Sequence, residues 1–237
     1  MGAQPAHSRS HSPPSAHRVG GPSRVGDAWV IGAEVEADES RVLEFKSVDA
    51  THGDVRSWMR DQLLPKLING FLNRRPLARE SRTALVLFGV TDAGRVVGMH
   101  ADRQLRDVLI RDVDTIVRQQ KAMNGSAGAL TGADVVLEFS PAVRRDARTG
   151  ALHDVPDLWV GELTVQSCFA RCPLYSFTEG GNEVSYERWS GSMRKLTLAE
   201  VGARVVAHAN ASASASAEPG SHAATAGASS SYYSGRR

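Results

Sequence analysis

The stretch "TALVLFGVTDAGRVVGMH", residues 83–100, decides the fold that the sequence predicts. It begins with an almost uninterrupted apolar run, passes through a short turn that contains Gly94, and ends in a second apolar run. A strand without polar alternation is typical of a sheet that is covered on both faces. Two apolar runs joined by a short glycine-containing turn indicate a hairpin. We therefore expect a hairpin whose first strand is buried on both faces.

Helical periodicity appears on both sides of this hairpin. Residues 55–73 and residues 103–120 place apolar side chains every three or four positions, which predicts two amphipathic helices. Pro65 should kink or split the first of them, because proline lacks the amide hydrogen that a helix interior needs. Thr197, followed three residues later by Glu200, predicts the capped start of a terminal helix.

The remaining regular segments are predicted to be strands. They cover residues 42–48, 134–141, 157–165 and 183–189, and residues 144–154 should form a hairpin tip. Together these elements predict an α+β fold, with a mixed or antiparallel sheet and two or three packed helices.

The two ends of the chain differ in composition from its middle. Residues 1–27 are rich in Pro, Ser, Gly and His, and residues 207–237 are rich in Ala and Ser. Such segments bury too little apolar surface to offset their ordering entropy, so we expect both to be disordered. Residues 28–206 should form one domain. The formal net charge of +2 comes from arginines in the tails, so a polyanion would have to bind local patches of the domain.

Several classes of protein are disfavoured by what the sequence lacks. No run of 18 apolar residues is present, which predicts no membrane partner. The two cysteines give no disulfide framework, which favours an intracellular protein of the cytoplasm or nucleus. A mitochondrial location is the less favoured alternative, because prolines interrupt the basic first 26 residues. No phosphate-binding G-x-x-x-x-G-K-[ST] loop occurs, so no nucleotide cofactor is expected.

Four motifs occur in a defined order along the predicted domain. They are "ESRVLEFK" (39–46), "LPKLINGFLN" (64–73), "LVLFGVTDAGRVVG" (85–98) and "CPLYSF…EVSYERWSGSMRKLTLAEV" (172–201). In this order they resemble the Schlafen AlbA-type domain family, and they span Glu39 to about Val201. The resemblance implies a Schlafen-core-like single lobe.

The resemblance also implies an activity, which is divalent-metal-dependent cleavage of structured RNA such as tRNA. The implied site holds Mg²⁺ or Mn²⁺ through two glutamates and an aspartate, which fall on Glu39, Glu44 and Asp92, with Lys46 beside the phosphate. Some relatives have the aspartate one position earlier, where this chain has Thr91. Carboxylate oxygens suit these hard cations, and the metal would polarise the scissile phosphate.

Each of these residues also has a simpler interpretation. Glu44 and Lys46 are two positions apart, so both could lie on the solvent face of an ordinary strand. Asp92 precedes a glycine turn, where aspartate is favoured for local hydrogen bonding. Glu39 reaches Glu44 only if the chain bends before Val42; otherwise it caps or solvates a chain end.

Basic residues gather at three places in the sequence. Guanidinium groups match phosphate oxygens, so the first two groups are candidate nucleic-acid contacts, although the first could be a solvated loop. These candidates are Arg74, Arg75, Arg79, Arg82, Arg188, Arg194 and Lys195. The third group, Arg144, Arg145 and Arg148, lies at the predicted hairpin tip.

Cys168 and Cys172 form a CxxxC pair. Some Schlafen proteins carry a structural zinc site, so the resemblance makes zinc conceivable here. No histidine pair accompanies the cysteines, which favours two free thiols instead.

The leading function predicted from the sequence is a metal-dependent endoribonuclease. The main alternative is a non-catalytic nucleic-acid-binding or assembly subunit that lacks the complete acid set. A third possibility is an AlbA-like DNA-binding module associated with transcription. Relatives that clamp RNA join two lobes, so a single lobe implies a homodimer or a related Schlafen-like partner.

Overall fold

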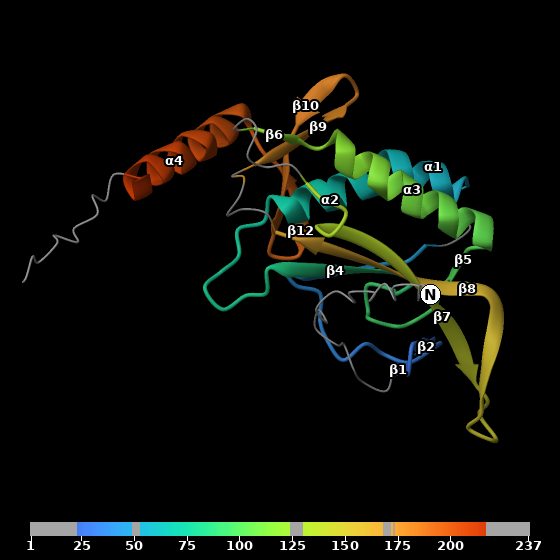
Figure 1. Cartoon of the computed structure of the whole chain (residues 1–237). Helices are drawn as coiled ribbons and strands as arrows, with labels where there is room; N and C mark the ends of the chain where they lie inside the picture. Colours follow the sequence, from blue (N-terminus) through green and yellow to red (C-terminus); the bar gives the residue numbers. More distant parts are fainter. Residues whose placement is uncertain (1–22, 49–52, 124–129, 168–171, 173, 217–237) are drawn as a thin grey trace, which may run out of the picture.

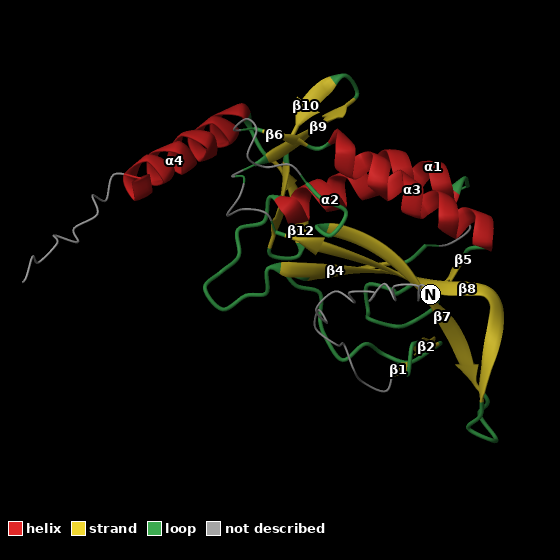
Figure 2. Ribbon diagram, viewed as in Figure 1, coloured by secondary structure: helices red, strands yellow, loops and turns green. Residues whose placement is uncertain are grey.

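The computed structural model describes residues 23–48, 53–123, 130–167, 172 and 174–216, with side chains described as far as residue 211. The predicted α+β class is confirmed: a mixed seven-stranded sheet carries helices on one face (Figures 1 and 2). Its strand order is β1 (Arg24–Val25), β2 (Ala28–Val30), β7 (Val135–Arg145), β8 (Leu152–Gln166), β4 (Thr83–Phe88) and β3 (Leu43–Lys46), with β5 (Met99–His100) paired to β8. The sheet is mixed because β2–β7 and β3–β4 are parallel pairs, while the other pairs are antiparallel.

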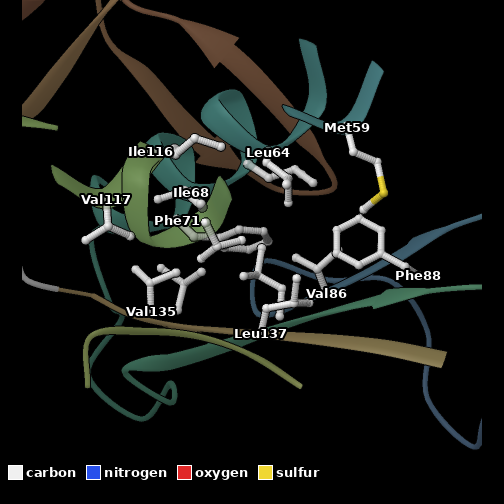
Figure 3. Packing of buried hydrophobic residues seen from close by; sticks show 14 of the residues in the cluster. Met59, Leu64, Ile68, Phe71, Val86, Phe88, Ile116, Val117, Val135 and Leu137 are labelled. Carbon is white, nitrogen blue, oxygen red and sulfur yellow. The ribbon is translucent and has the colours of Figure 1, made fainter. Parts of the chain in front are cut away.

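Strand β4 (Thr83–Phe88) lies between β3 (Leu43–Lys46) and β8 (Leu152–Gln166). Val86 and Phe88 point into the core beneath the helices (Figure 3), whereas Leu87 packs into a second cluster on the opposite face. Successive side chains of a strand point to opposite faces, so burial of both faces requires apolar residues at every position. Burial of both faces of β4 therefore explains its continuous apolar run, as we predicted from the sequence.

The long hairpin of β7 (Val135–Arg145) and β8 confirms the predicted hairpin tip. Beyond β7 lie β2 (Ala28–Val30) and β1 (Arg24–Val25), so the described domain begins a few residues before the predicted start at residue 28. The hairpin tip extends away from the helices (Figure 1).

The hairpin predicted within residues 83–100 forms only in part. The second apolar run makes one bridge to the first, between Val90 and Val96, and its strand β5 (Met99–His100) pairs with β8 instead. Gly89 has a φ of 92°. The amides of Val97 and Gly98, which belong to the second apolar run, both donate to its carbonyl oxygen, at 2.9 and 2.8 Å. The chain therefore folds back over Gly89 and crosses to the neighbouring strand.

Pro65 changes the hydrogen bonding of its helix without breaking it. The α-helix α1 (Val55–Trp58) passes into a π-helical turn, η2 (Met59–Leu63), and then into α2 (Leu64–Leu72), with Pro65 in the first turn of α2. A π-turn is a known way for a helix to accommodate an interruption of its usual bonding. The predicted separation into two helical pieces is thus replaced by one run with a wider turn.

Helix α3 (Arg103–Gln119) matches its prediction closely. Asp102 caps its start by accepting a hydrogen bond from the Leu105 amide at 2.7 Å. Its apolar face, which includes Ile116 and Val117, packs with α2 over the sheet (Figure 3). These two helices form the layer that covers one face of the sheet.

The C-terminal part adds small sheets and a last helix. The single strand predicted over residues 183–189 is two strands that belong to different sheets and meet at Ser185. The elements are β6 (Lys121–Ala122), β9 (Tyr175–Glu179), β10 (Asn182–Val184), β11 (Tyr186–Trp189), β12 (Ser192–Lys195) and α4 (Leu198–Ser216).

The predicted capping box at the start of α4 is present: Glu200 accepts from the Thr197 amide at 2.8 Å, and the Glu200 amide donates to the Thr197 hydroxyl at 3.3 Å. Helix α4 runs to Ser216, beyond the predicted domain end at residue 206. Most of the two predicted tails, residues 1–22 and 217–237, lies outside the described residues. Within the described ranges, no helix has the length and apolar character needed to cross a membrane.

Candidate nucleic-acid interface

Glu44 is buried and paired with two cations. It lies beside Val86 in the register of β3 with β4, so its side chain faces the helix layer. One carboxylate oxygen forms an ion pair with the Arg188 guanidinium, and the other lies 2.5 Å from the Lys46 ammonium. The side chain of Arg188 is fully buried, and that of Glu44 is 6% exposed. Both oxygens of Glu44 are therefore engaged by protein cations.

Glu39 stabilises the open edge of the sheet. The chain bends before β3 as the prediction required, because the Ser40 amide donates to the Leu43 carbonyl at 2.9 Å. The bend brings the Glu39 carboxylate to the Phe45 amide, which donates to it at 2.8 Å. Strand β3 is the last strand of the sheet, so this amide has no neighbouring strand to bind. The Glu39 carboxylate therefore supplies the hydrogen-bond acceptor that a neighbouring strand would otherwise provide.

Asp92 comes from a different segment of the chain. It is exposed in the turn between Gly89 and Gly94, where the Gly94 amide donates to the Thr91 carbonyl at 2.8 Å. Within the part of the chain that the structure describes, no group of three His, Cys, Asp or Glu side chains is placed to hold a metal ion. The described residues therefore lend the predicted Mg²⁺ or Mn²⁺ site of Glu39, Glu44 and Asp92 no support, and this site stays a prediction.

Two buried asparagines explain the second motif. The Asn73 side chain donates to the carbonyls of Tyr175 and Tyr186, both at 2.9 Å, and accepts from the Tyr175 amide at 2.6 Å. Asn69 accepts from the Tyr186 amide at 2.6 Å and donates to the Tyr175 carbonyl at 3.0 Å. Buried backbone groups need such partners. The asparagines thus join α2 to β9 and β11.

Gly70 lets α2 approach the β11–β12 hairpin. A Cβ atom at this position would lie 2.3 Å from the sulfur of Met193 and 3.6 Å from the Arg188 amide. The close approach also places the Arg188 guanidinium 5.4 Å from the centre of the Phe71 ring. The motif residues of α2 therefore hold β11, and with it Arg188, against β3.

Arg74 and Arg188 are buried, so neither side chain can make the nucleic-acid contact that was predicted for it. The buried Arg74 side chain forms an ion pair with Glu80 at 2.7 Å and donates to the Ser81 carbonyl at 2.6 Å. Burial lowers the pKa of Arg74 from its usual value, and the neighbouring Glu80 opposes this. Arg74 holds the loop that follows α2, and Arg188 holds Glu44.

The other arginines of that loop, Arg75, Arg79 and Arg82, are exposed. Arg41 connects the loop to the β11–β12 hairpin: it donates to the Arg75 carbonyl at 2.7 Å, and its guanidinium carbon lies 5.9 Å from the centre of the Trp189 ring. Two basic groups that are far apart in sequence therefore meet at one surface.

On the hairpin itself, Arg194 and Lys195 are about half exposed and paired with acids. Arg194 forms ion pairs with Glu187, at 3.4 Å, and with Glu200. Lys195 lies 3.2 Å from Glu179. We call the surface formed by Arg41, Arg75, Arg79, Arg82, Trp189 and Arg194 the Trp189 surface; Lys195 lies on the other face of the hairpin, beside Tyr186 and Glu179.

Sequence analysis did not select Trp189. No signal in the local sequence identifies it, because tryptophan is on average well buried and its position at the end of a predicted strand fits that expectation. The third basic group, Arg144, Arg145 and Arg148, is exposed at the hairpin tip, at the opposite end of β8 from the Trp189 surface.

The cysteines give the predicted zinc site no support. Cys168 lies outside the described residues. Cys172 is a free, buried thiol that donates to the Leu174 carbonyl at 3.0 Å. Of the predicted zinc ligands, the described part of the chain therefore contains one, and it is engaged with the backbone.

The fold and this surface together define an α+β protein with a basic, tryptophan-bearing face. Comparison of the chain with known protein families found no matching family, and comparison with curated proteins found no match. The resemblance to the Schlafen AlbA-type domain stays a prediction.

Proposed function

We propose that this chain is a nucleic-acid-binding module whose ligand is RNA, and that it binds through the Trp189 surface. The observation that supports this most directly is the exposure of Arg75, Arg79 and Arg82 on one loop. Arginine donates in a fork that matches phosphate oxygens, and clustered exposed arginines are typical of backbone contacts to nucleic acids. The loop is anchored by the buried Arg74–Glu80 ion pair, which keeps the exposed arginines at one end of the sheet.

We further propose that binding occurs without metal-dependent cleavage, which is the non-catalytic alternative predicted from the sequence. The pairing of Glu44 with Arg188 and Lys46 supports this, because a carboxylate engaged with two cations is a poor ligand for a third. The edge-stabilising role of Glu39 and the exposed turn position of Asp92 point the same way.

The binding proposal is tested by charge removal at the loop. The full chain and the variant Arg75→Ser/Arg79→Ser/Arg82→Ser are titrated into fluorescein-labelled single-stranded RNA, and anisotropy is measured over a range of salt concentrations. We expect weaker binding and a salt dependence of log affinity reduced by about 2, since each phosphate contact on a single strand contributes roughly 0.7. The change should be similar for different RNA sequences.

The matched control removes the same charge elsewhere. Arg144→Ser/Arg145→Ser/Arg148→Ser acts at the other end of β8 and should leave RNA affinity close to that of the original chain. Equal losses in both variants would mean that only net charge matters, and absence of RNA binding by the original chain would overturn the proposal outright.

Cleavage is tested separately. The original chain is incubated with tRNA in the presence of Mn²⁺ or of a chelator, and the products are separated on a denaturing gel. We expect intact tRNA under both conditions. Cleavage that requires Mn²⁺ would contradict the non-catalytic proposal and favour the endoribonuclease.

The assembly state remains a prediction of the resemblance. A single lobe would need a second copy or a related lobe to enclose RNA, and light scattering of the purified chain measures whether a homodimer forms. A monomer that binds RNA tightly would remove the need for a second lobe.

A further inference from the structure

Trp189 is unusual among the aromatic residues of the described chain. It ends β11, next to Ser190, whose φ of 48° turns the chain into β12. Trp189 is 54% exposed, whereas Trp29 is completely buried. Aromatic side chains contribute most when they are covered, so an exposed tryptophan on a rigid hairpin suggests a surface that is covered by a ligand.

Two guanidinium groups lie over the ring at the outer range of a cation–π contact. The guanidinium carbons of Arg41 and Arg194 lie 5.9 and 5.8 Å from the centre of the Trp189 ring. Arg106, by contrast, lies 3.7 Å from the centre of the Trp159 ring, which is the distance of direct stacking. These flanking arginines are therefore farther from the Trp189 ring than a directly stacked guanidinium, and Trp189 is 54% exposed.

Both flanking arginines are held in place without a ligand. Arg41 forms an ion pair with Glu80 at 3.3 Å and also binds the Arg75 carbonyl. Arg194 is held by Glu187 and Glu200. Because these contacts fix the positive groups around the ring in advance, less conformational entropy is lost when a ligand binds.

The combination of an open aromatic ring and fixed cations defines the chemistry of the occupant. A flat π system stacks on tryptophan, and a phosphate next to it pairs with a guanidinium. A nucleotide carries both groups in one unit. An apolar peptide would match the ring but would make no use of the positive charge of the surrounding arginines.

We propose that Trp189 stacks on an unpaired base, so that the ligand of the Trp189 surface is single-stranded nucleic acid or an unpaired loop. This inference rests on the proposed nucleic-acid-binding function and specifies its substrate class. Bases inside a duplex have both faces occupied by their neighbours, so a stacking platform selects strands or loops whose bases are free.

The test compares Trp189→Ala and Trp189→Phe in the full chain. Each is titrated by anisotropy into three labelled RNAs: a single strand, a fully paired duplex of the same length, and a hairpin with an unpaired loop. We expect Trp189→Ala to bind the single strand and the hairpin about 10- to 100-fold more weakly. Duplex affinity, which depends on phosphates alone, should change by less than about 2-fold, and Trp189→Phe should retain most of the affinity.

A second readout reports on the ring itself. Intrinsic tryptophan fluorescence of the original chain should be quenched by the unlabelled single strand, and the quenching should be much smaller in Trp189→Phe, which retains the other three tryptophans. Melting curves establish that both variants fold, as an exposed side chain predicts.

The outcomes separate the inference from the function it rests on. RNA binding that is equal for single strand and duplex and unchanged in Trp189→Ala would overturn the inference and leave the proposed function standing. A dimer that dissociates in Trp189→Ala with RNA affinity unchanged would assign the ring to a protein contact and also overturn it. Binding to none of the RNAs would remove both.

Discussion

Arg188 and Glu44 form a buried ion pair that joins the C-terminal hairpin to the edge strand of the main sheet. Arg188 also donates to the Ser40 carbonyl at 2.9 Å, and Glu44 is further paired with Lys46. Sequence analysis assigned Glu44 to a metal and Arg188 to a phosphate. In the folded chain the two opposite charges stabilise each other, so the first structural role of this pair is to fasten β11 beside β3.

Glu44→Ala should therefore destabilise the fold strongly. Removal of one partner from a buried ion pair leaves the other charge without compensation, which costs about 3–5 kcal/mol. Urea unfolding followed by circular dichroism measures the loss in the free energy of unfolding.

The matched variant removes both charges. Glu44→Leu/Arg188→Met replaces the pair with apolar side chains and should recover most of the lost stability, since buried ion pairs are often replaceable in this way. A Glu44→Ala chain as stable as the original would contradict a structural role for the pair and would return Glu44 to the candidate catalytic residues.

The elements whose character depends on local periodicity were predictable from the sequence. Helix α3 follows from the spacing of residues such as Val113 and Ile116, and the capping box of α4 follows from Thr197 and Glu200. The continuous apolar run predicted β4, because a strand that is buried on both faces needs apolar residues at nearly every position.

The strand or side chain with which each element pairs was harder to predict from the sequence. The transfer of β5 to β8 depends on how the chain crosses Gly89, and the partner of Glu44 lies far away in the sequence, on β11. Trp189 was missed for a related reason: its alternation in β11 fits a buried strand, and only the position of the hairpin leaves the ring exposed. Contacts between residues far apart in the sequence decide these three features, and the local sequence pattern does not predict such contacts.

Asn73→Ala should destabilise the junction of α2 with β9 and β11. It would leave the Tyr175 amide and the carbonyls of Tyr175 and Tyr186 with fewer partners in a buried site. Each unsatisfied buried group costs about 1–3 kcal/mol, so we expect a loss of at least about 2 kcal/mol in urea unfolding.

Asn182→Ala is the control for this change. Asn182 is exposed and makes a single long hydrogen bond of 3.4 Å to the Gly180 carbonyl. Its replacement should change stability by less than about 0.5 kcal/mol. Similar losses in Asn73→Ala and Asn182→Ala would show that the buried asparagine network contributes little.

Gly89→Ala should also be strongly destabilising. A Cβ atom at Gly89 would lie 2.8 Å from the carbonyl carbon of Gly98, and the φ of 92° is unfavourable for any other residue. Backbone strain of this kind costs about 1–3 kcal/mol before the clash is added. Thermal melting measures the effect, with Gly132→Ala, which has open space around it, as the control. Equal melting temperatures for the two variants would contradict the close crossing of the chain at Gly89.

Glu200 links the start of α4 to the Trp189 surface, and its charge should make stability depend on pH. The backbone hydrogen bond from Thr197, followed by the hydrogen bond from the Arg194 side chain, lowers the pKa of Glu200 to about 2. A carboxyl with a lowered pKa in the folded state stabilises the fold above its ordinary pKa of 4.5, and this contribution is lost as the pH falls toward 2.

Glu200→Gln should therefore lower the melting temperature at about pH 6, and the gap to the original chain should narrow steadily between about pH 4.5 and pH 2. Below that window Glu200 is protonated in both the folded and the unfolded chain, so the original chain has no remaining advantage from its charge. Glu36→Gln, which removes an exposed acid before β3, serves as the control and should leave the gap near zero throughout. A gap for Glu200→Gln that stayed constant from about pH 6 to pH 2 would mean that the capping box acts through its shape alone, and that the carboxylate charge does not hold Arg194 beside Trp189.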